Sequence, residues 1–235
     1  MNWFNLACCA IPCCASFSLT YPCSSVTVLV VQKAEIQKIY SRYSGFYDII
    51  FEQFFYPRIR LGLEKIGIQS GDRIIEVGVG TGLSLSLYPE YCKVVGIDIT
   101  RRMLERAKVK KEKLGLSHID LFEMDGENIC FDDDSFDHAV LPFVVSVVPN
   151  LEQLMAEIKR VTKNSGKIII INHLCTKFTW VSRMEEVLSP FFMKLGWKTG
   201  LSVDMFSNHC NLHIEEVSRK HNLDPWFILH ATNRK

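Results

Sequence analysis

The chain has 235 residues, of which 48% are hydrophobic and 23% are charged, a globular composition with enough apolar residues for one sizeable core. Lys and Arg total 27 against 26 Asp and Glu, and the net charge of +1 gives no support to a nucleic-acid-binding protein. The nine cysteines are unevenly placed, which argues against a secreted disulfide scaffold.

The first 32 residues differ from the rest of the chain. They carry no charge, include five of the nine cysteines, and are interrupted by Pro12 and Pro22. A secretory signal would begin with a basic region, and a membrane-spanning helix would need roughly 20 apolar residues without such breaks. We therefore expect a tail over residues 1–32 and a folded domain over residues 33–235. An uncleaved tail, a translation start assigned too far upstream and a peripheral membrane anchor all remain open for the tail.

Apolar positions recur at helical spacing between Ile36 and Phe51, which predicts one or two amphipathic helices. Short apolar runs then alternate with helix-like segments. The predicted strands are 73–77, 93–97, 119–123, 137–141 and 167–172, and the predicted helices follow Gly82 and cover 100–114 and 151–162. This alternation predicts βαβ units and a parallel sheet covered on both faces. Two further strands, 212–217 and 226–232, are expected to form a hairpin at one sheet edge.

The first predicted strand runs directly into a glycine-rich loop with Gly78, Gly80 and Gly82. Glycine allows the backbone to approach a ligand closely. A dinucleotide-binding loop follows the pattern G-x-G-x-x-G, whereas the third glycine here comes one residue early, which argues against NAD. Glu76 lies just before the loop, where a carboxylate would repel a pyrophosphate and would suit a cationic ligand.

Acidic residues follow the next two predicted strands. Asp98 ends the second strand, where folds of this kind hydrogen-bond the hydroxyls of a ribose. Asp125 and Gly126 follow the third strand, and a carboxylate beside a backbone N–H can bind the edge of an adenine. Because the carboxyl ends of parallel strands meet at one edge of a sheet, these groups predict a site for one nucleoside.

In chain order, Glu76-x-Gly78-x-Gly80-x-Gly82, Asp98, Asp125-Gly126 and Phe136-Asp137 resemble the motifs of class I S-adenosylmethionine-dependent methyltransferases. The resemblance covers residues 37–173. It implies an α/β fold, a Rossmann-like three-layer sandwich with a mostly parallel seven-stranded sheet, an antiparallel edge hairpin and an N-terminal helical cover. It also implies S-adenosyl-L-methionine as cofactor and no metal. The cofactor-binding residues that it implies are Tyr40, Tyr47, Glu76, Gly78, Gly80, Thr81, Asp98, Ile99, Met103, Asp125 and Gly126.

Segments outside these motifs resemble the bacterial phosphatidylethanolamine N-methyltransferases of the soluble peripheral type. The segments are 39–48, 76–85, 144–150 and 171–173. Quinone C-methyltransferases carry an Arg-Asn pair after the fourth strand, where this chain has Ser146-Val147-Val148. The resemblance implies stepwise methylation of phosphatidylethanolamine to phosphatidylcholine by a cytoplasmic protein bound to the inner, anionic membrane surface.

Two other functions remain open. One is methylation of a quinone or another small hydrophobic acceptor, which a deep, dry pocket without a phosphate-binding Arg or Lys would favour. The other is a cofactor-binding regulator without catalysis, which the cofactor motifs alone do not exclude.

The candidate catalytic residues are His173 and Tyr43. A primary ammonium has no free lone pair, so a base such as His173 could take its proton before methylation. Tyr40, Tyr43 and Tyr47 share one helix face and could hold a methylated ammonium by cation–π attraction. A structural hydrogen bond for His173 and core packing for the tyrosines are the alternatives.

The same N-terminal helical region could dock on a membrane. Phe54 and Phe55 follow several basic residues on a predicted amphipathic helix, a pattern that fits an anionic membrane surface. An ordinary core helix is the alternative.

Overall fold

The computed structural model describes residues 47–174, 201–208, 210–221, 224 and 226–235. The expected tail and most of the predicted N-terminal helical cover lie outside these residues. In the parts of the chain that are described, no helix is long and apolar enough to cross a bilayer.

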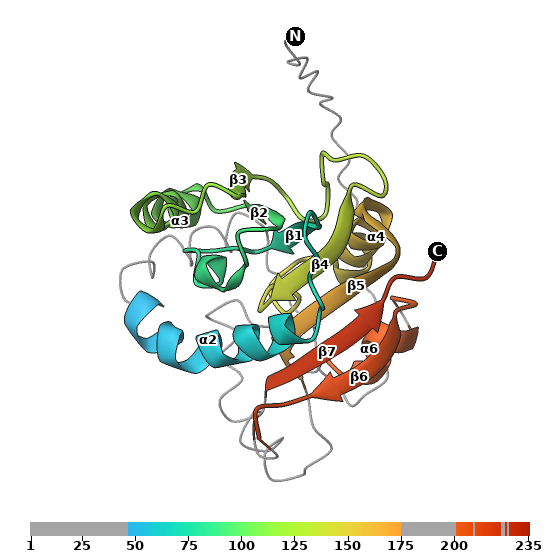
Figure 1. The fold of residues 1–235 in the computed structure, drawn as a ribbon. Helices are drawn as coiled ribbons and strands as arrows, with labels where there is room; N and C mark the ends of the chain where they lie inside the picture. Colours follow the sequence, from blue (N-terminus) through green and yellow to red (C-terminus); the bar gives the residue numbers. More distant parts are fainter. Residues whose placement is uncertain (1–46, 175–200, 209, 222–223, 225) are drawn as a thin grey trace.

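One seven-stranded sheet forms the centre of the described structure (Figure 1). Its strands lie in the order β3-β2-β1-β4-β5-β7-β6. They are β1 (Arg73–Val77), β2 (Lys93–Asp98), β3 (Ile119–Glu123), β4 (Phe136–Pro142), β5 (Thr162–His173), β6 (His213–Ser218) and β7 (Trp226–Thr232). Strands β1 to β5 pair in parallel, and β7 runs antiparallel between β5 and β6. The predicted mostly parallel sheet with an edge hairpin is therefore confirmed.

Helices cover both faces of this sheet. Helices α2 (Tyr47–Glu64) and α3 (Arg101–Leu114) lie on one face, and α4 (Leu151–Val161) and α6 (Val203–Asn208) lie on the other. Neighbouring residues of β1 show the division, because Ile74 packs in the cluster with α2 and α3 whereas Ile75 packs in the cluster with α4. Both faces of the strands are thus apolar, as expected for a parallel sheet inside a three-layer sandwich.

The prediction of a helix after Gly82 is wrong. The segment forms only a short 3₁₀ helix, η1 (Leu85–Leu87), and Tyr88 is extended. Pro89 follows directly; proline disfavours the helical region for the residue before it and offers no N–H to continue a helix. The glycine-rich loop is therefore followed by a compact turn, which buries Leu85 and Tyr88.

A buried ion pair joins α2 to the turn before β7. Arg58 Nη2 lies 2.8 Å from Asp224 Oδ1, and Arg58 Nε lies 3.0 Å from Asp224 Oδ2. The side chains are only 8% and 0% exposed. Asp224 Oδ1 also accepts a hydrogen bond from the Trp226 N–H at 3.1 Å. This pair, with the two-point geometry that makes Arg–carboxylate bonds strong, fixes the start of β7 against α2.

The proposal that Phe55 docks on a membrane is wrong. Phe55 is 7% exposed and packs against Phe143 and Trp226, with ring centroids 4.2 and 4.9 Å away. The core alternative holds for this residue because its position in α2 faces the sheet; the side chain of Phe54 is not among those described.

We expect Asp224→Ala to lower the free energy of unfolding by about 3–5 kcal/mol, since it leaves the Arg58 guanidinium buried without its carboxylate. Urea denaturation of both proteins measures the difference.

The matched control is Glu64→Ala, which removes the partner of Arg60 on the same helix. The Arg60 side chain is 66% exposed and that of Glu64 is 54% exposed. Surface pairs of this kind contribute about 0–1 kcal/mol to the free energy of unfolding. Equal losses from the two substitutions would contradict the buried-pair analysis.

Candidate active site

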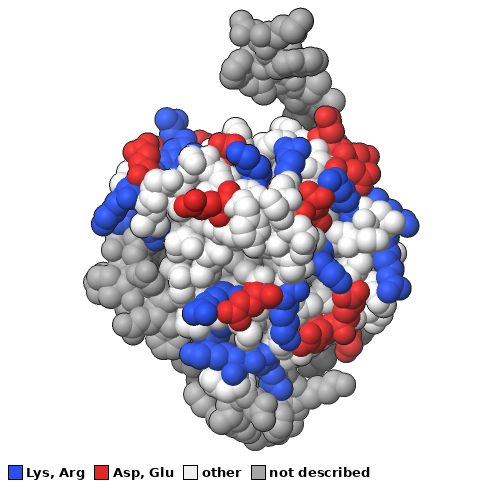
Figure 2. All heavy atoms as spheres, in the orientation of Figure 1, with Lys and Arg blue, Asp and Glu red and all other residues white. Residues whose placement is uncertain are grey.

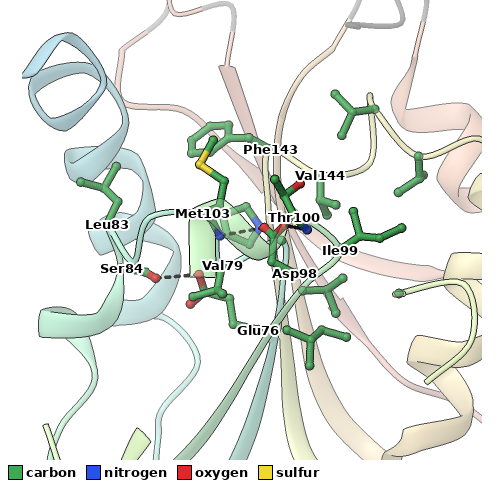
Figure 3. A pocket seen from close by; sticks show the side chains of 18 of the residues that line it. Glu76, Val79, Leu83, Ser84, Asp98, Ile99, Thr100, Met103, Phe143 and Val144 are labelled. Atoms are coloured by element: carbon green, nitrogen blue, oxygen red, sulfur yellow. Dashed lines mark hydrogen bonds between the residues drawn. The ribbon is translucent and has the colours of Figure 1, made fainter. Parts of the chain in front are cut away.

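A cavity of about 180 Å³ lies at the carboxyl ends of β1, β2 and β4 (Figure 3). The chain leaves β1 toward β2 on one side and returns to β4 on the other, which is the topological switch point where open α/β sheets bind ligands. Nine residues predicted from the sequence line it. They are Glu76, Gly78, Gly80, Thr81, Asp98, Ile99, Met103, Asp125 and Gly126.

Asp98 ties the glycine loop to the start of α3. Its Oδ2 accepts the Gly80 N–H at 2.9 Å, and its Oδ1 accepts the Thr100 N–H at 2.7 Å. Burial raises the pKa of this carboxyl, while the hydrogen bonds from Thr100 and Gly80 act in the opposite direction. Each carboxylate oxygen has a second lone pair, so Asp98 can hold the loop and still accept a hydrogen bond from a ligand.

The glycines of the loop have different roles. At Gly78, φ is +79° and an added Cβ would lie 2.9 Å from Val144, so the loop passes very close to the segment after β4. At Gly80, φ is +54°, and the nearest atom to an added Cβ would be 3.9 Å away. The space beside Gly80 thus belongs to the cavity. Positive φ favours glycine at both positions.

Glu76 is a buried carboxyl group in the cavity wall. Ser84 Oγ donates to Oε1 at 2.6 Å (Figure 3), and the Tyr88 hydroxyl donates to Oε2 at 2.5 Å. Burial raises the pKa of Glu76 to about 7; the two hydrogen bonds oppose this shift, and the Asp98 charge adds to it. A cationic ligand in the cavity would favour the ionised form.

Asp125 and Gly126 form the third part of the predicted nucleoside site. Asp125 Oδ1 accepts the Glu127 N–H at 3.0 Å. An added Cβ at Gly126 would lie 2.8 Å from Val77 and 2.9 Å from Leu154. Gly126 is therefore required for close packing of this turn, whatever its contact with a ligand.

All the charged side chains among the described lining residues of the cavity are acidic. Glu76, Asp98, Asp125 and Glu127 contribute carboxyl groups, and no Lys, Arg or His is among the described lining residues. Such a wall attracts cations. S-adenosylmethionine carries a sulfonium and an ammonium, and the open space beside Gly80 leaves room for its close approach, so these residues fit the expected cofactor.

The candidate catalytic residues are less well placed. His173 is not among the described lining residues; its ring meets the Trp226 ring edge-on, with centroids 5.6 Å apart. Tyr40 and Tyr43 lie outside the described residues, and the side chain of Tyr47 in α2 is not described. The roles of all four remain predictions.

Three aromatic residues of the cavity wall had no predicted role in the site. They are Phe55, Phe143 and Trp226. Phe55 belonged to the predicted amphipathic helix, but the direction of its side chain depends on the packing of α2. Trp226 opens β7, and Phe143 follows β4; only the folded sheet brings them beside the glycine loop.

The pKa of Glu76 predicts a pH-dependent stability of the cofactor-free protein. The folded state binds the Glu76 proton more tightly than the unfolded state does. Raising the pH from 5 to 8 therefore lowers the free energy of unfolding, and Glu76 accounts for about 2–3 kcal/mol of this loss. Glu76→Gln removes the titrating group and should abolish that contribution.

Urea denaturation of both proteins at several pH values tests this, because other groups titrate alike in the two proteins. Parallel curves of unfolding free energy against pH would show that Glu76 is ionised throughout.

Comparison with known proteins agrees with this geometry. A protein-family model described as a methyltransferase domain matches residues 75–170. The phosphatidylethanolamine N-methyltransferase of Cereibacter sphaeroides is 38% identical over 147 residues, covering 62% of this chain and 72% of that enzyme. A ubiquinone/menaquinone biosynthesis C-methyltransferase of Citrifermentans bemidjiense is 38% identical over 153 residues, covering 63% of this chain and 64% of that enzyme.

Solved structures show the same fold. A SAM-dependent methyltransferase from Thermotoga maritima superimposes with a TM-score of 0.65 at 18% identity, covering 84% of this chain and 99% of the other. The sheet order, the glycine loop at the switch point and these relatives lead to one conclusion: the chain belongs to the class I S-adenosylmethionine-dependent methyltransferases and is an enzyme that uses S-adenosyl-L-methionine.

Proposed function

We propose that this enzyme methylates the amine of phosphatidylethanolamine stepwise to phosphatidylcholine. The observation that carries the proposal is the cavity wall, which combines four carboxyl groups with three aromatic rings. Such a wall suits two cations, the sulfonium of the donor and the ammonium of the acceptor. The phosphatidylethanolamine N-methyltransferase relative supports the choice of acceptor.

S-adenosylmethionine supplies an electrophilic methyl group on its sulfonium. In our proposal, Asp98 accepts hydrogen bonds from the ribose hydroxyls, and Asp125 with the Gly126 N–H binds the adenine edge. Gly78, Gly80 and Thr81 line the approach of the remaining part of the cofactor, and Glu76 provides negative charge there. Ile99 and Met103 supply apolar contact, and Tyr40 and Tyr47 close over the cofactor from the N-terminal region.

The acceptor amine must lose a proton before each transfer. We propose His173 as the group that accepts it, and Tyr43 as a second catalytic residue on the resemblance alone. His173 adjoins Trp226 of the cavity wall, so a proton could reach it by a small rearrangement or through a bridging water.

A peripheral position on the anionic inner face of the membrane follows from this substrate. On the face drawn in Figure 2, Lys and Arg are interspersed with Asp and Glu among the described residues. We propose that the chain is organised as the tail 1–32 and the methyltransferase domain 33–235.

A quinone or another small hydrophobic acceptor is the second candidate. The specific observation in its favour is that the described lining residues include no Lys or Arg to bind a phosphate. The quinone methyltransferase relative, of whose length the chain covers less than two thirds, points the same way.

Asp98→Asn should weaken binding of S-adenosylmethionine by about 1.5–3 kcal/mol, roughly 10- to 150-fold, because the ribose loses a charged acceptor. Isothermal titration calorimetry measures the affinity. Asp120→Asn, a substitution of the same kind at an exposed residue of β3, should leave the affinity unchanged. Wild-type affinity in a folded Asp98→Asn protein would remove Asp98 from the site.

Incubation with labelled S-adenosylmethionine and vesicles of phosphatidylethanolamine with an anionic phospholipid should label mono-, di- and trimethylated lipid in sequence. Demethylmenaquinone in the same vesicles is the competing acceptor. Label in the quinone alone would replace the proposed acceptor with the second candidate. Cofactor binding without label in either acceptor would overturn both candidate acceptors.

A further inference from the structure

Phe55, Phe143 and Trp226 form one cluster at the cavity, which we call the aromatic wall. The Phe55 centroid lies 4.2 Å from Phe143 and 4.9 Å from Trp226, and Phe143 lies 5.1 Å from Trp226. The contacts of Trp226 with Phe55 and Phe143 are edge-on, at 90° and 85°. Phe55 is buried, whereas Phe143 and Trp226 are half-buried, and all three residues line the cavity. The rings are too close for a ligand to enter between them, so a ligand would lie against the wall.

The backbone holds Phe143 in an unfavourable conformation. Its φ is +59°, in the left-handed region that non-glycine residues rarely adopt. Its N–H donates to the Ile171 carbonyl at 2.7 Å, which ties the end of β4 to β5. Strain of this kind persists where the surrounding structure imposes it and is concentrated at ligand sites. The Phe143 ring appears with the other lining side chains in Figure 3.

The aromatic wall adjoins the cofactor loop. Val144, the next residue after Phe143, lies so close to Gly78 that a Cβ there would be 2.9 Å away. From the other side, the Arg58–Asp224 pair fixes α2, which carries Phe55, and Asp224 accepts the Trp226 N–H. Three distant parts of the chain therefore hold the wall beside the place where the methyl donor binds.

We propose that Phe143 and Trp226 bind the methylated ammonium of the acceptor by cation–π attraction, with Phe55 as their buried support. This inference rests on the proposed function, because an amine methylated stepwise ends as a quaternary cation. Each added methyl group makes the ammonium less hydrated and removes an N–H donor. Aromatic ring faces then replace hydrogen-bond acceptors as its partners.

The charge of the cavity favours a cation over a neutral ring at this wall. Glu76, Asp98, Asp125 and Glu127 line the same cavity, and the described lining residues include no cationic side chain to oppose them. A quinone could stack on the aromatic wall but would gain nothing from these carboxyl groups. The wall also explains how mono- and dimethylated intermediates would be retained for the next transfer.

Calorimetry with a cation and its neutral isostere tests the proposal directly. The protein, loaded with S-adenosylhomocysteine, is titrated with dihexanoyl phosphatidylcholine below its critical micelle concentration, and with the analogue whose headgroup is 3,3-dimethylbutyl. We expect the wild type to bind the trimethylammonium lipid roughly 2- to 30-fold more tightly, the range of a single cation–π contact.

Three variants separate ring electrons from apolar packing. Trp226→Leu and Phe143→Leu should lose most of the preference, while Trp226→Phe should keep it. Phe122→Leu, the same change at an exposed residue on β3, is the matched control and should behave as wild type. Thermal melts and affinity for S-adenosylhomocysteine identify a variant that fails to fold. If Trp226→Leu fails to fold, the comparison of Trp226→Phe with Phe143→Leu tests the proposal.

An equal preference in the wild type and in both folded Leu variants would overturn the inference, and so would the absence of any preference in the wild type. The proposed function fails separately. A wild type that keeps the preference but does not methylate phosphatidylethanolamine would retain the aromatic wall as a cation site and lose the lipid acceptor. A wild type that methylates phosphatidylethanolamine without showing the preference would retain the lipid acceptor and lose the aromatic wall as a cation site.

Discussion

The parallel pairing of β1 with β4 is the constraint on which the site depends. In this pairing Ile74 lies opposite His138 and Glu76 lies opposite Val140, although the strands are separated in the chain by β2, α3 and β3. The register places the glycine loop beside the residues that follow β4, and Val144 comes to lie against Gly78. A shift of one residue would turn every side chain of β4 to the opposite face, which would remove the cavity.

The carboxyl end of the parallel strands also carries groups that destabilise the protein when no ligand is bound. Glu76 is almost fully buried with a raised pKa, the pKa of Asp98 is also raised, and Phe143 has a strained backbone. The apolar clusters on the two faces of the sheet stabilise the fold enough to tolerate them. A cationic cofactor would relieve part of this cost, because it favours the ionised carboxyl groups. Cofactor binding and stability are therefore expected to be coupled.

Support for the site comes from outside the cofactor motifs. The Arg58–Asp224 pair joins residues 166 positions apart in the chain, and it fixes both α2 and the start of β7, and thereby Phe55 and Trp226. In our proposal, the donor side of the cavity is built on strand ends of the parallel sheet. The proposed acceptor side is built on α2, the end of β4 and the antiparallel strand β7, which are the parts in which enzymes with a common cofactor can differ.

The sequence by itself determined the mostly parallel α/β sheet and the cofactor class, and it predicted residues at strand ends that the structure brings to one cavity. Glycine, Asp98 and Asp125 are required by local geometry at strand ends, and such requirements are visible in a linear pattern. It also predicted a helix after Gly82 that Pro89 prevents, and for Phe55 it left a membrane-facing position open that the packing of α2 rules out. Only the tertiary structure decided which aromatic residues line the cavity. It also decided that His173 contacts Trp226, a lining residue, and is not itself among the described lining residues. These contacts join residues far apart in the chain, and their geometry depends on how α2 packs against the sheet and on how β7 pairs with β5.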